Sequence, residues 1–297
     1  MDAVMATAPF EYYAPSAVDE ALALLNAHGT DAKPLAGGQS LVPMLTLGLA
    51  GPAVVVDLNR LDELRGVRRE GAWLRIGALV RHRALERGEG DLSLCPLLQE
   101  AAAFIGNVRV RTMGTIGGSL AHADPAAELP AVLRALDGEL IVRGPDAERT
   151  IPAAQFFTGA LTTTLQPGEL LVAVRIAVPG SRTGYAVEEF SRRAGDFAIV
   201  AVVAVVELEA GGRVARARMA VAGAGSVPAR LAAAEQSLAG AAPSAQALRE
   251  AVMDHELEIE PESDVHASAA YRRHLTRVLA ARALTRAAFR ALEDPLP

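Results

Sequence analysis

The chain has 297 residues, of which 51% are hydrophobic and 22% charged, so it can bury a large core and is not disordered. At roughly 100–200 residues per domain, this length predicts two domains. The 29 basic and 35 acidic side chains give a net charge of −6. This balance argues against general nucleic-acid binding, because neutralising phosphates needs clustered positive charge.

Cysteine and lysine are scarce, which excludes several kinds of site. Cys95 is the one cysteine, whereas a disulfide needs two and an iron–sulfur cluster held by this chain alone would need about four thiolates. We expect Cys95 to pack in the core rather than act as a nucleophile. Lys33 is the one lysine and Pro34 follows it, so the Gly-Lys pair of a P-loop is absent.

No segment has the pattern of a membrane span or a signal peptide. The longest uncharged apolar run, residues 197–206, is too short to cross a bilayer and is typical of a buried strand. The first residues lack a basic start followed by an apolar stretch. We therefore expect a cytoplasmic protein.

Helices and strands alternate along the first part of the chain. Apolar residues at i, i+3, i+4 and i+7 predict a helix that begins after Ser16 and ends at Gly29. Asp124 is predicted to cap a helix that runs to Leu136. Residues 81–83 are predicted to form a surface loop. Further strands are expected at 34–36, 53–58, 73–78, 109–113, 139–143 and 170–178, and a further helix at 92–104.

The pattern changes near Pro179, where we place a domain boundary. Three strand-like runs follow, at 185–191, 197–208 and 214–221, and then three helices, at 229–238, 244–255 and 268–292. This order predicts an α+β domain with a three-stranded antiparallel sheet. Arginines recur every four residues along the last helix. They predict a solvated face with glutamate partners, or alternatively a face that docks another subunit.

Two glycine-rich turns are the most informative features. Gly37-Gly38 precedes Ser40, and a second turn spans residues 114–119. Glycine brings backbone N–H groups close to a ligand, and consecutive N–H groups form concave nests for phosphate oxygens. Two such turns predict a diphosphate held between them, as in a dinucleotide. The Rossmann pattern G-x-G-x-x-G is absent, so a different fold is needed.

Residues 34–44 and 111–130 resemble the two FAD-binding segments of the flavoprotein (medium) subunits of the xanthine dehydrogenase and carbon monoxide dehydrogenase family, the molybdenum hydroxylases. The resemblance continues at 191–198 and at 271–275, in order and at the family's spacing. It implies an α+β fold: a two-part FAD-binding domain of the vanillyl-alcohol-oxidase (PCMH) type over residues 1–179, then a smaller α+β domain over residues 180–297.

The resemblance also implies the residues that contact FAD. The first segment would wrap the diphosphate, the second would supply another phosphate cradle, and other residues would lie around the flavin ring. These residues are Pro34, Leu35, Ala36, Gly37, Gly38, Gln39, Ser40 and Leu41; Thr112, Thr115, Ile116, Gly117, Gly118, Ser119 and Asp124; and Ile105, Glu128, Leu171, Asp196 and Phe197. Three positions depart from the family. Gln39 stands where relatives often have His or Thr, Ser119 where many have Asn, and Phe197 where the carbon monoxide dehydrogenase type has Tyr.

By this resemblance the chain is an oxidoreductase subunit that carries FAD. A small subunit with [2Fe–2S] clusters would deliver electrons, and a large molybdopterin subunit would oxidise the substrate, usually in a dimer of such heterotrimers. The external acceptor would be a quinone, oxygen or a nicotinamide nucleotide. No catalytic side chain and no metal ligands are expected on this chain. Two alternatives are a self-contained FAD oxidoreductase of the same fold and a scaffold that keeps the glycine turns without binding a cofactor.

Overall fold

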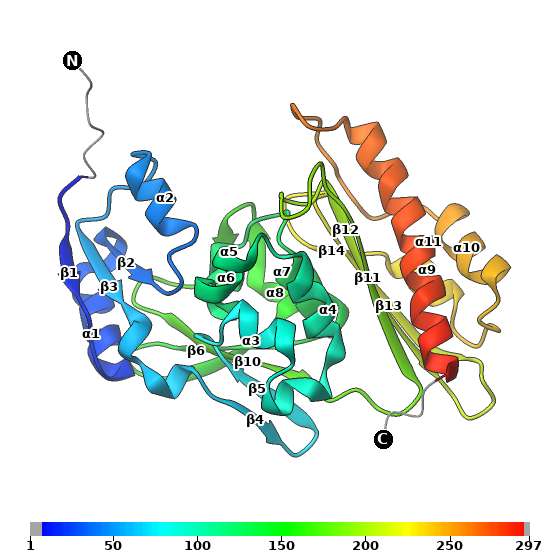
Figure 1. Cartoon of the computed structure of the whole chain (residues 1–297), viewed down its shortest axis with the longest axis horizontal. Coiled ribbons are helices and arrows are strands. Elements are labelled where there is room, and N and C mark those ends of the chain that lie inside the picture. Colours follow the sequence, from blue (N-terminus) through cyan, green and yellow to red (C-terminus); the bar gives the residue numbers. More distant parts are fainter. Residues whose placement is uncertain (1–7, 294–297) are drawn as a thin grey trace.

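Three sheets follow one another along the chain, each with its own helices (Figure 1). The computed structural model describes residues 8–293, so the N-terminal residues on which the signal-peptide prediction depended lie outside the described part. The first two sheets belong to the N-terminal half and the third to the C-terminal half. These helices and sheets agree with the predicted α+β fold, in which a two-part domain precedes a smaller C-terminal one.

The first lobe is a small parallel sheet with one long helix packed on it. Its strands, in spatial order, are β1 (Glu11–Tyr13), β3 (Val54–Asp57) and β2 (Ala32–Leu35). Helix α1 (Val18–His28) buries its predicted apolar face against this sheet. The predicted cap at Ser16 is wrong, because the helix begins two residues later and the Ser16 backbone N–H instead donates to the Glu20 carboxylate at 3.0 Å. The short helix α2 (Leu41–Thr46) follows the first glycine turn.

The second lobe is a five-stranded antiparallel sheet that carries most of the helices. In spatial order its strands are β4 (Val67–Glu70), β5 (Trp73–Gly77), β10 (Leu170–Ala177), β6 (Glu139–Arg143) and β7 (Glu148–Pro152). Its helices are α3 (His82–Arg87), α4 (Pro96–Phe104), α5 (Val108–Met113), α6 (Ile116–His122), α7 (Glu128–Ala135) and α8 (Ala153–Phe156). A hairpin of β8 (Phe157–Gly159) and β9 (Thr162–Thr163) completes the lobe.

Two predictions in this lobe were wrong at helix starts. Residues 109–113 are helical rather than extended, because the Asn107 side chain accepts hydrogen bonds from the N–H groups of Arg109 and Val110 at 2.9 and 3.2 Å and so caps α5. Helix α7 begins at Glu128, whereas Asp124 caps the preceding turn by accepting from the N–H of Ala126 at 2.8 Å.

The core of this lobe contains Cys95, as predicted. Its side chain is fully buried, and burial raises the pKa of the thiol to about 12. The thiolate is therefore not formed at neutral pH, which fits packing rather than nucleophilic chemistry.

The C-terminal lobe is a four-stranded antiparallel sheet, one strand more than predicted. The strands are β11 (Thr183–Phe190), β12 (Val200–Leu208), β13 (Val214–Ala222) and β14 (Ala229–Arg230), followed by α9 (Ala232–Ser237), α10 (Ala245–Met253) and α11 (Ala269–Glu293). Strand β14 has only two residues and lies in a segment predicted as the start of a helix. Such a short strand has no periodicity for the sequence to show.

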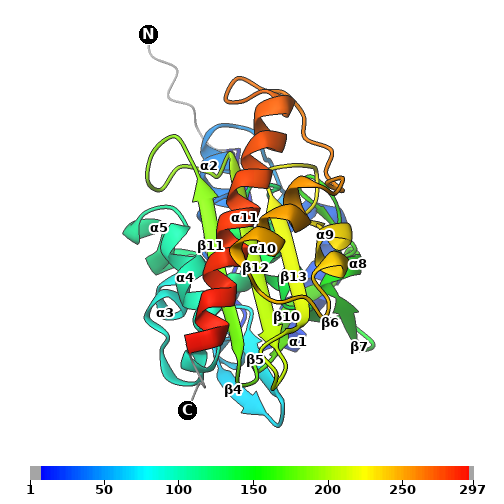
Figure 2. The ribbon, with the colours of Figure 1, turned by 90° about the vertical axis from the view of Figure 1, so that its right-hand side faces the viewer.

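Helices cover both faces of this sheet. Helix α11 lies across one face (Figure 2), while α4 and α7 of the second lobe pack against the other. Strand β12 is therefore buried on both sides, which explains the long apolar run in the sequence. Arg286 and Arg290 of α11 have the predicted glutamate partners, but their shared partner Glu100 belongs to α4 of the other lobe. These ion pairs thus join the two halves of the chain.

Candidate cofactor site

The first glycine loop leaves a row of backbone donors free. It joins β2 to α2, and Gly38 has a φ of +70°, a conformation that favours glycine. Among the hydrogen bonds described for residues 8–293, none uses the backbone N–H of the five consecutive residues Gly37, Gly38, Gln39, Ser40 and Leu41. Consecutive unpaired N–H groups of this kind form a nest for an anion.

The second glycine loop is held tightly by the chain itself. Thr115 caps α6 by accepting from the N–H of Gly118 at 3.1 Å. The N–H groups of Ile116 and Gly117 donate to the carbonyls of Val80 and Ala78 at 3.0 and 2.9 Å. This loop is therefore a rigid wall whose N–H groups are largely used internally, and the free backbone donors of the site come mainly from the first loop.

The two loops touch each other directly. A Cβ placed on Gly37 would lie 2.4 Å from the carbonyl oxygen of Met113 and 2.7 Å from the Cα of Gly114, so only glycine fits there. A cavity of about 380 Å³ opens at this contact. Its lining residues are Leu35, Ala36, Gly37, Gly38, Gln39, Val42, Pro43, Asn59 and Met113.

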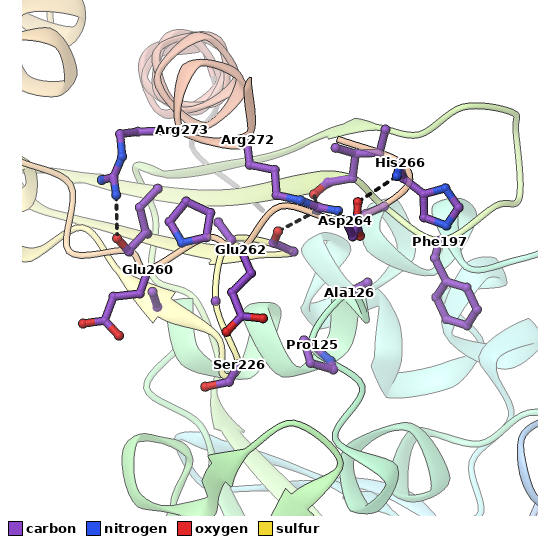
Figure 3. Close-up of a pocket in the computed structure, with 18 of the residues that line it drawn as sticks. Pro125, Ala126, Phe197, Ser226, Glu260, Glu262, Asp264, His266, Arg272 and Arg273 are labelled. Atoms are coloured by element: carbon purple, nitrogen blue, oxygen red, sulfur yellow. Dashed lines mark hydrogen bonds and ion pairs between the residues drawn. The ribbon is translucent and has the colours of Figure 1, made fainter. Parts of the chain in front are cut away.

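A larger cleft of about 1500 Å³ lies between the second lobe and the C-terminal domain. It contains three of the predicted site residues, Asp124, Asp196 and Phe197. Phe197 lies in the turn before β12 rather than within a strand, and 72% of it is exposed. Figure 3 shows Phe197 below His266, with Ala126 and Pro125 also on the lower side of the cleft. An aromatic ring this exposed is available to stack on a planar ligand.

The lip of this cleft is fixed by one backbone hydrogen bond between the second and the C-terminal lobe and by the side chain of Arg272. The N–H of Gly223, at the end of β13, donates to the carbonyl of Pro125 at 2.8 Å. The buried Arg272 guanidinium donates to the carbonyls of Ile199 and Gly223 at 2.5 and 2.9 Å and pairs with Asp264 at 2.7 Å. Arg272 therefore anchors the segment that carries Phe197. It belongs to the sequence motif at 271–275.

Glu128 is a buried carboxyl group near a second carboxyl that the sequence analysis missed. Only 7% of Glu128 is exposed, and burial raises its pKa to about 7. Burial, with the charge of Glu128, raises the pKa of Glu189 on β11 to about 8, and the Glu189 Oε2 atom has no hydrogen-bond partner. Both groups can therefore hold a proton near neutral pH. Only the packing of β11 brings Glu189 into this region, so no local sequence signal reveals it.

Twelve of the twenty predicted site residues line neither cavity, and Ile105, Leu171 and Thr112 are among them. Ile105, which follows α4, and Leu171, on β10, are buried in the core of the second lobe, and neither lines a cavity described above. The exposed Thr112 donates its hydroxyl to the carbonyl of Val108 within α5, at 2.7 Å. The structure thus brings the two loops together without bringing every predicted contact to one cavity.

The predicted surface loop at residues 81–83 is wrong, because His82 begins α3 and is buried. Within residues 8–293, neither ring nitrogen of His82 has a hydrogen-bond partner, and burial lowers its pKa to about 4. The ring packs under the second loop: a Cβ on Gly114 would lie 2.9 Å from the His82 Nδ1. His82 therefore supports this loop as a neutral side chain.

Family models match nearly the whole chain. Residues 8–179 match the FAD binding domain in molybdopterin dehydrogenase, and residues 185–287 match the CO dehydrogenase flavoprotein C-terminal domain. The chain belongs to this flavoprotein family. It is an oxidoreductase subunit whose cofactor is FAD, and the glycine cradle with its free N–H groups fits the diphosphate of that cofactor.

Individual relatives cover the chain almost end to end. The chain is 40% identical to the 6-hydroxypseudooxynicotine dehydrogenase complex subunit alpha of Paenarthrobacter nicotinovorans, over 95% of both chains. It is 37% identical to the carbon monoxide dehydrogenase medium chain of Afipia carboxidovorans, over 95% of this chain and 98% of the relative. The solved carbon monoxide dehydrogenase from Hydrogenophaga pseudoflava, which lacks the Mo-pyranopterin moiety, superposes with a TM-score of 0.92 at 38% identity, over 96% of this chain and 99% of its own.

The described part of the chain has no candidate membrane helix and no candidate metal-binding cluster. In residues 8–293, no helix combines the length and the apolar character needed to cross a membrane. The same residues contain no group of three or more His, Cys, Asp or Glu side chains placed to hold a metal ion.

Proposed function

We propose that this chain carries FAD as the electron-transfer subunit of a molybdopterin and iron–sulfur dehydrogenase. Electrons would arrive from [2Fe–2S] clusters of a small subunit and leave to an external acceptor. The observation that carries the proposal is the row of unpaired N–H groups in the first glycine loop, set against the second loop. When bound, FAD supplies a group that accepts electrons singly or in pairs and so links one-electron and two-electron carriers.

The two loops have different roles in this proposal. The N–H groups of Gly37 to Leu41 bind the diphosphate oxygens, while the rigid second loop closes the other side of the cradle. The half-buried Ser119 would add a hydroxyl on this side, while the Thr115 hydroxyl stays buried as the cap of α6. Because these donors are fixed backbone groups, they bind the cofactor without the loss of side-chain freedom that a flexible cation would incur.

The larger cleft would hold the flavin end. Phe197 would cover one face of the isoalloxazine, and Asp196 would lie at its edge. Phe keeps the aromatic face of the family's Tyr but removes its hydroxyl, so it tunes the ring by packing alone. Glu128 would face the cofactor as a neutral carboxylic acid, since its pKa near 7 lets it donate a hydrogen bond.

We also place the domain boundary between residues 179 and 180. The change from the sheet of the second lobe to the sheet of the C-terminal lobe supports it, as do the family matches that end at 179 and resume at 185.

The partners proposed are a large molybdopterin subunit and a small iron–sulfur subunit, in a dimer of heterotrimers. Names such as "complex subunit alpha" and "medium chain" among the relatives support a multi-subunit assembly.

The experiment that tests this proposal is purification of the tagged chain from cells that also express its neighbouring genes. We expect two further chains to copurify, together with molybdenum, iron and FAD. Rapid mixing with the substrate of the complex should then reduce the clusters before the flavin. A chain that purifies alone with FAD and oxidises a small substrate without molybdenum would support the self-contained oxidoreductase instead. If the chain binds no FAD either alone or with its partners, only the hypothesis of a scaffold without a cofactor remains.

A further inference from the structure

We infer that Arg81 and Asn59 form a latch that sets the first glycine loop in the conformation that binds the FAD diphosphate. This inference rests on the proposed placement of the diphosphate at that loop. Neither residue belongs to a glycine motif, and they come from different lobes of the FAD-binding half: Asn59 follows β3, and Arg81 precedes α3. The latch therefore spans the junction between these lobes.

The geometry of the latch is a chain of hydrogen bonds between the two glycine loops. The Asn59 Nδ2 donates to the carbonyl oxygen of Ala36 at 2.8 Å. The Arg81 Nη2 donates to the Asn59 Oδ1 at 2.6 Å, and its Nη1 donates to the carbonyl oxygen of Met113. Two side chains thus connect the carbonyls of Ala36 and Met113, the residues that directly precede the two glycine loops.

Asn59 is itself held in place. The Asp57 Oδ1 accepts from the backbone N–H of Asn59 at 2.9 Å and from its Nδ2 at 2.6 Å. The other Asp57 oxygen accepts from the hydroxyl of Tyr12 on β1. Asn59 therefore has a fixed orientation, which allows it to orient the Ala36 carbonyl in turn.

The consequence for the loop follows from peptide geometry. In a planar trans peptide, the C=O and the N–H point in opposite directions. Because Asn59 holds the carbonyl of Ala36, the N–H of Gly37 must point the other way, toward the row of free donors. The latch thus selects one orientation for the first N–H of the nest, which the flexible Gly37-Gly38 pair would not keep by itself.

Arg81 also brings a positive charge that makes no direct ion pair, although the nearby Asp57 acts on it through space and partly offsets the lowering of its pKa by burial. Among the ion pairs described for residues 8–293, none involves Arg81, and the nearby Asp57 is bonded to Asn59 and Tyr12. Burial and the neighbouring Arg65 lower the pKa of Arg81, yet a guanidinium remains charged at neutral pH. An unpaired cation beside the cradle favours an anionic ligand.

The test is FAD binding to the full chain after its flavin has been removed, measured by titration for Arg81→Met, Asn59→Ala and the double variant. Each single variant should weaken FAD binding about 10- to 100-fold. The double variant should bind FAD at most about threefold more weakly than the single variant with the lower affinity, because the two residues act as one unit. Arg81→Lys should restore part of the affinity, since one ammonium can reach only one of the two acceptors.

Two matched variants keep the inference distinct from the proposed site. Arg87→Met removes an exposed arginine at the end of α3, the helix that Arg81 precedes, and should leave FAD affinity unchanged. Gly37→Ala fills the contact with Met113 and should abolish FAD binding. If Gly37→Ala loses FAD while Arg81→Met binds it within twofold of wild type, the latch is wrong and the site stands. If Gly37→Ala also binds FAD normally, the placement of the diphosphate is wrong. The unfolding temperatures of the flavin-free Arg81→Met and Asn59→Ala chains are measured as well. If these chains are destabilised enough to explain their lost FAD affinity, the latch is also wrong.

Discussion

Gly117 and Ala78 meet backbone to backbone in the wall of the cofactor site. The N–H of Gly117 donates to the carbonyl of Ala78 at 2.9 Å, and a Cβ on Gly117 would lie 2.5 Å from the Cβ of Ala78. This contact places the second glycine loop against the end of β5 without any side chain between them. A glycine here is therefore required for close approach, and the loop is part of the core of the second lobe as well as of the site.

Replacing Gly117 with alanine should damage stability and FAD binding together. The added methyl group must push the loop from Ala78, which should lower the free energy of unfolding by about 1–3 kcal/mol. Urea unfolding of the flavin-free chain measures this change. Gly51→Ala is the matched control, because nothing lies within 4 Å of its added Cβ, and it should change stability by less than about 0.5 kcal/mol. Equal effects of the two substitutions would contradict the close packing described above.

Phe197→Ala should change the properties of the bound flavin without changing the stability of the fold. With 72% of the residue exposed, its removal should change the free energy of unfolding by less than about 0.5 kcal/mol. The flavin, however, should lose a stacking partner, so its fluorescence should rise and its reduction potential should shift. Phe197→Tyr should keep the stacked ring and show the smaller change in both signals. Unaltered flavin signals in Phe197→Ala would mean that the ring does not cover the isoalloxazine.

The lowered pKa of the buried His82 should make the folded chain less stable in mild acid. Its pKa in the folded protein is about 4, below the ordinary 6.5, so the unfolded chain takes up a proton first as the pH falls. Stability is fully present above about pH 6.5 and decreases toward pH 4, by about 3 kcal/mol for this residue. His82→Leu should therefore match wild type at pH 8 and lose less stability by pH 4.5. His274→Leu, at an exposed position of α11, should keep the wild-type slope, and an unchanged slope in His82→Leu would contradict the assignment.

The raised pKa of Glu189 should give the free energy of unfolding the opposite dependence on pH. Its folded pKa is about 8, above the ordinary 4.5, so the ionised form is disfavoured in the folded state and stability decreases as the pH rises between these values. Glu189→Gln should leave stability at pH 5 nearly unchanged and raise it at pH 8.5 by about 1–2 kcal/mol, allowing for partial exposure. Urea titrations at the two pH values measure this. Glu209→Gln, at an exposed position, is the control and should show no such difference.

Local patterns predicted much of this molecule, and packing between distant segments explains most of what they missed. The valine run of β12 and the two glycine loops carry their signal in adjacent residues, so both were found. The pattern of β-branched residues at 109–113 predicted an extended segment, but the Asn107 side chain caps a helix, α5, there. Asn59, Arg81 and Glu189 act on the site only because strands and helices far apart in sequence meet there, and nothing in their neighbours reveals it.

The central claim is that this chain holds FAD in a form that exchanges electrons with partners. The most direct measurement is the visible spectrum of the purified full chain, recorded before dithionite, after dithionite and after a quinone is added. The account predicts flavin bands near about 450 nm that bleach on reduction and return with the acceptor, and FAD released on denaturation. A colourless chain that also fails to take up added FAD would contradict it.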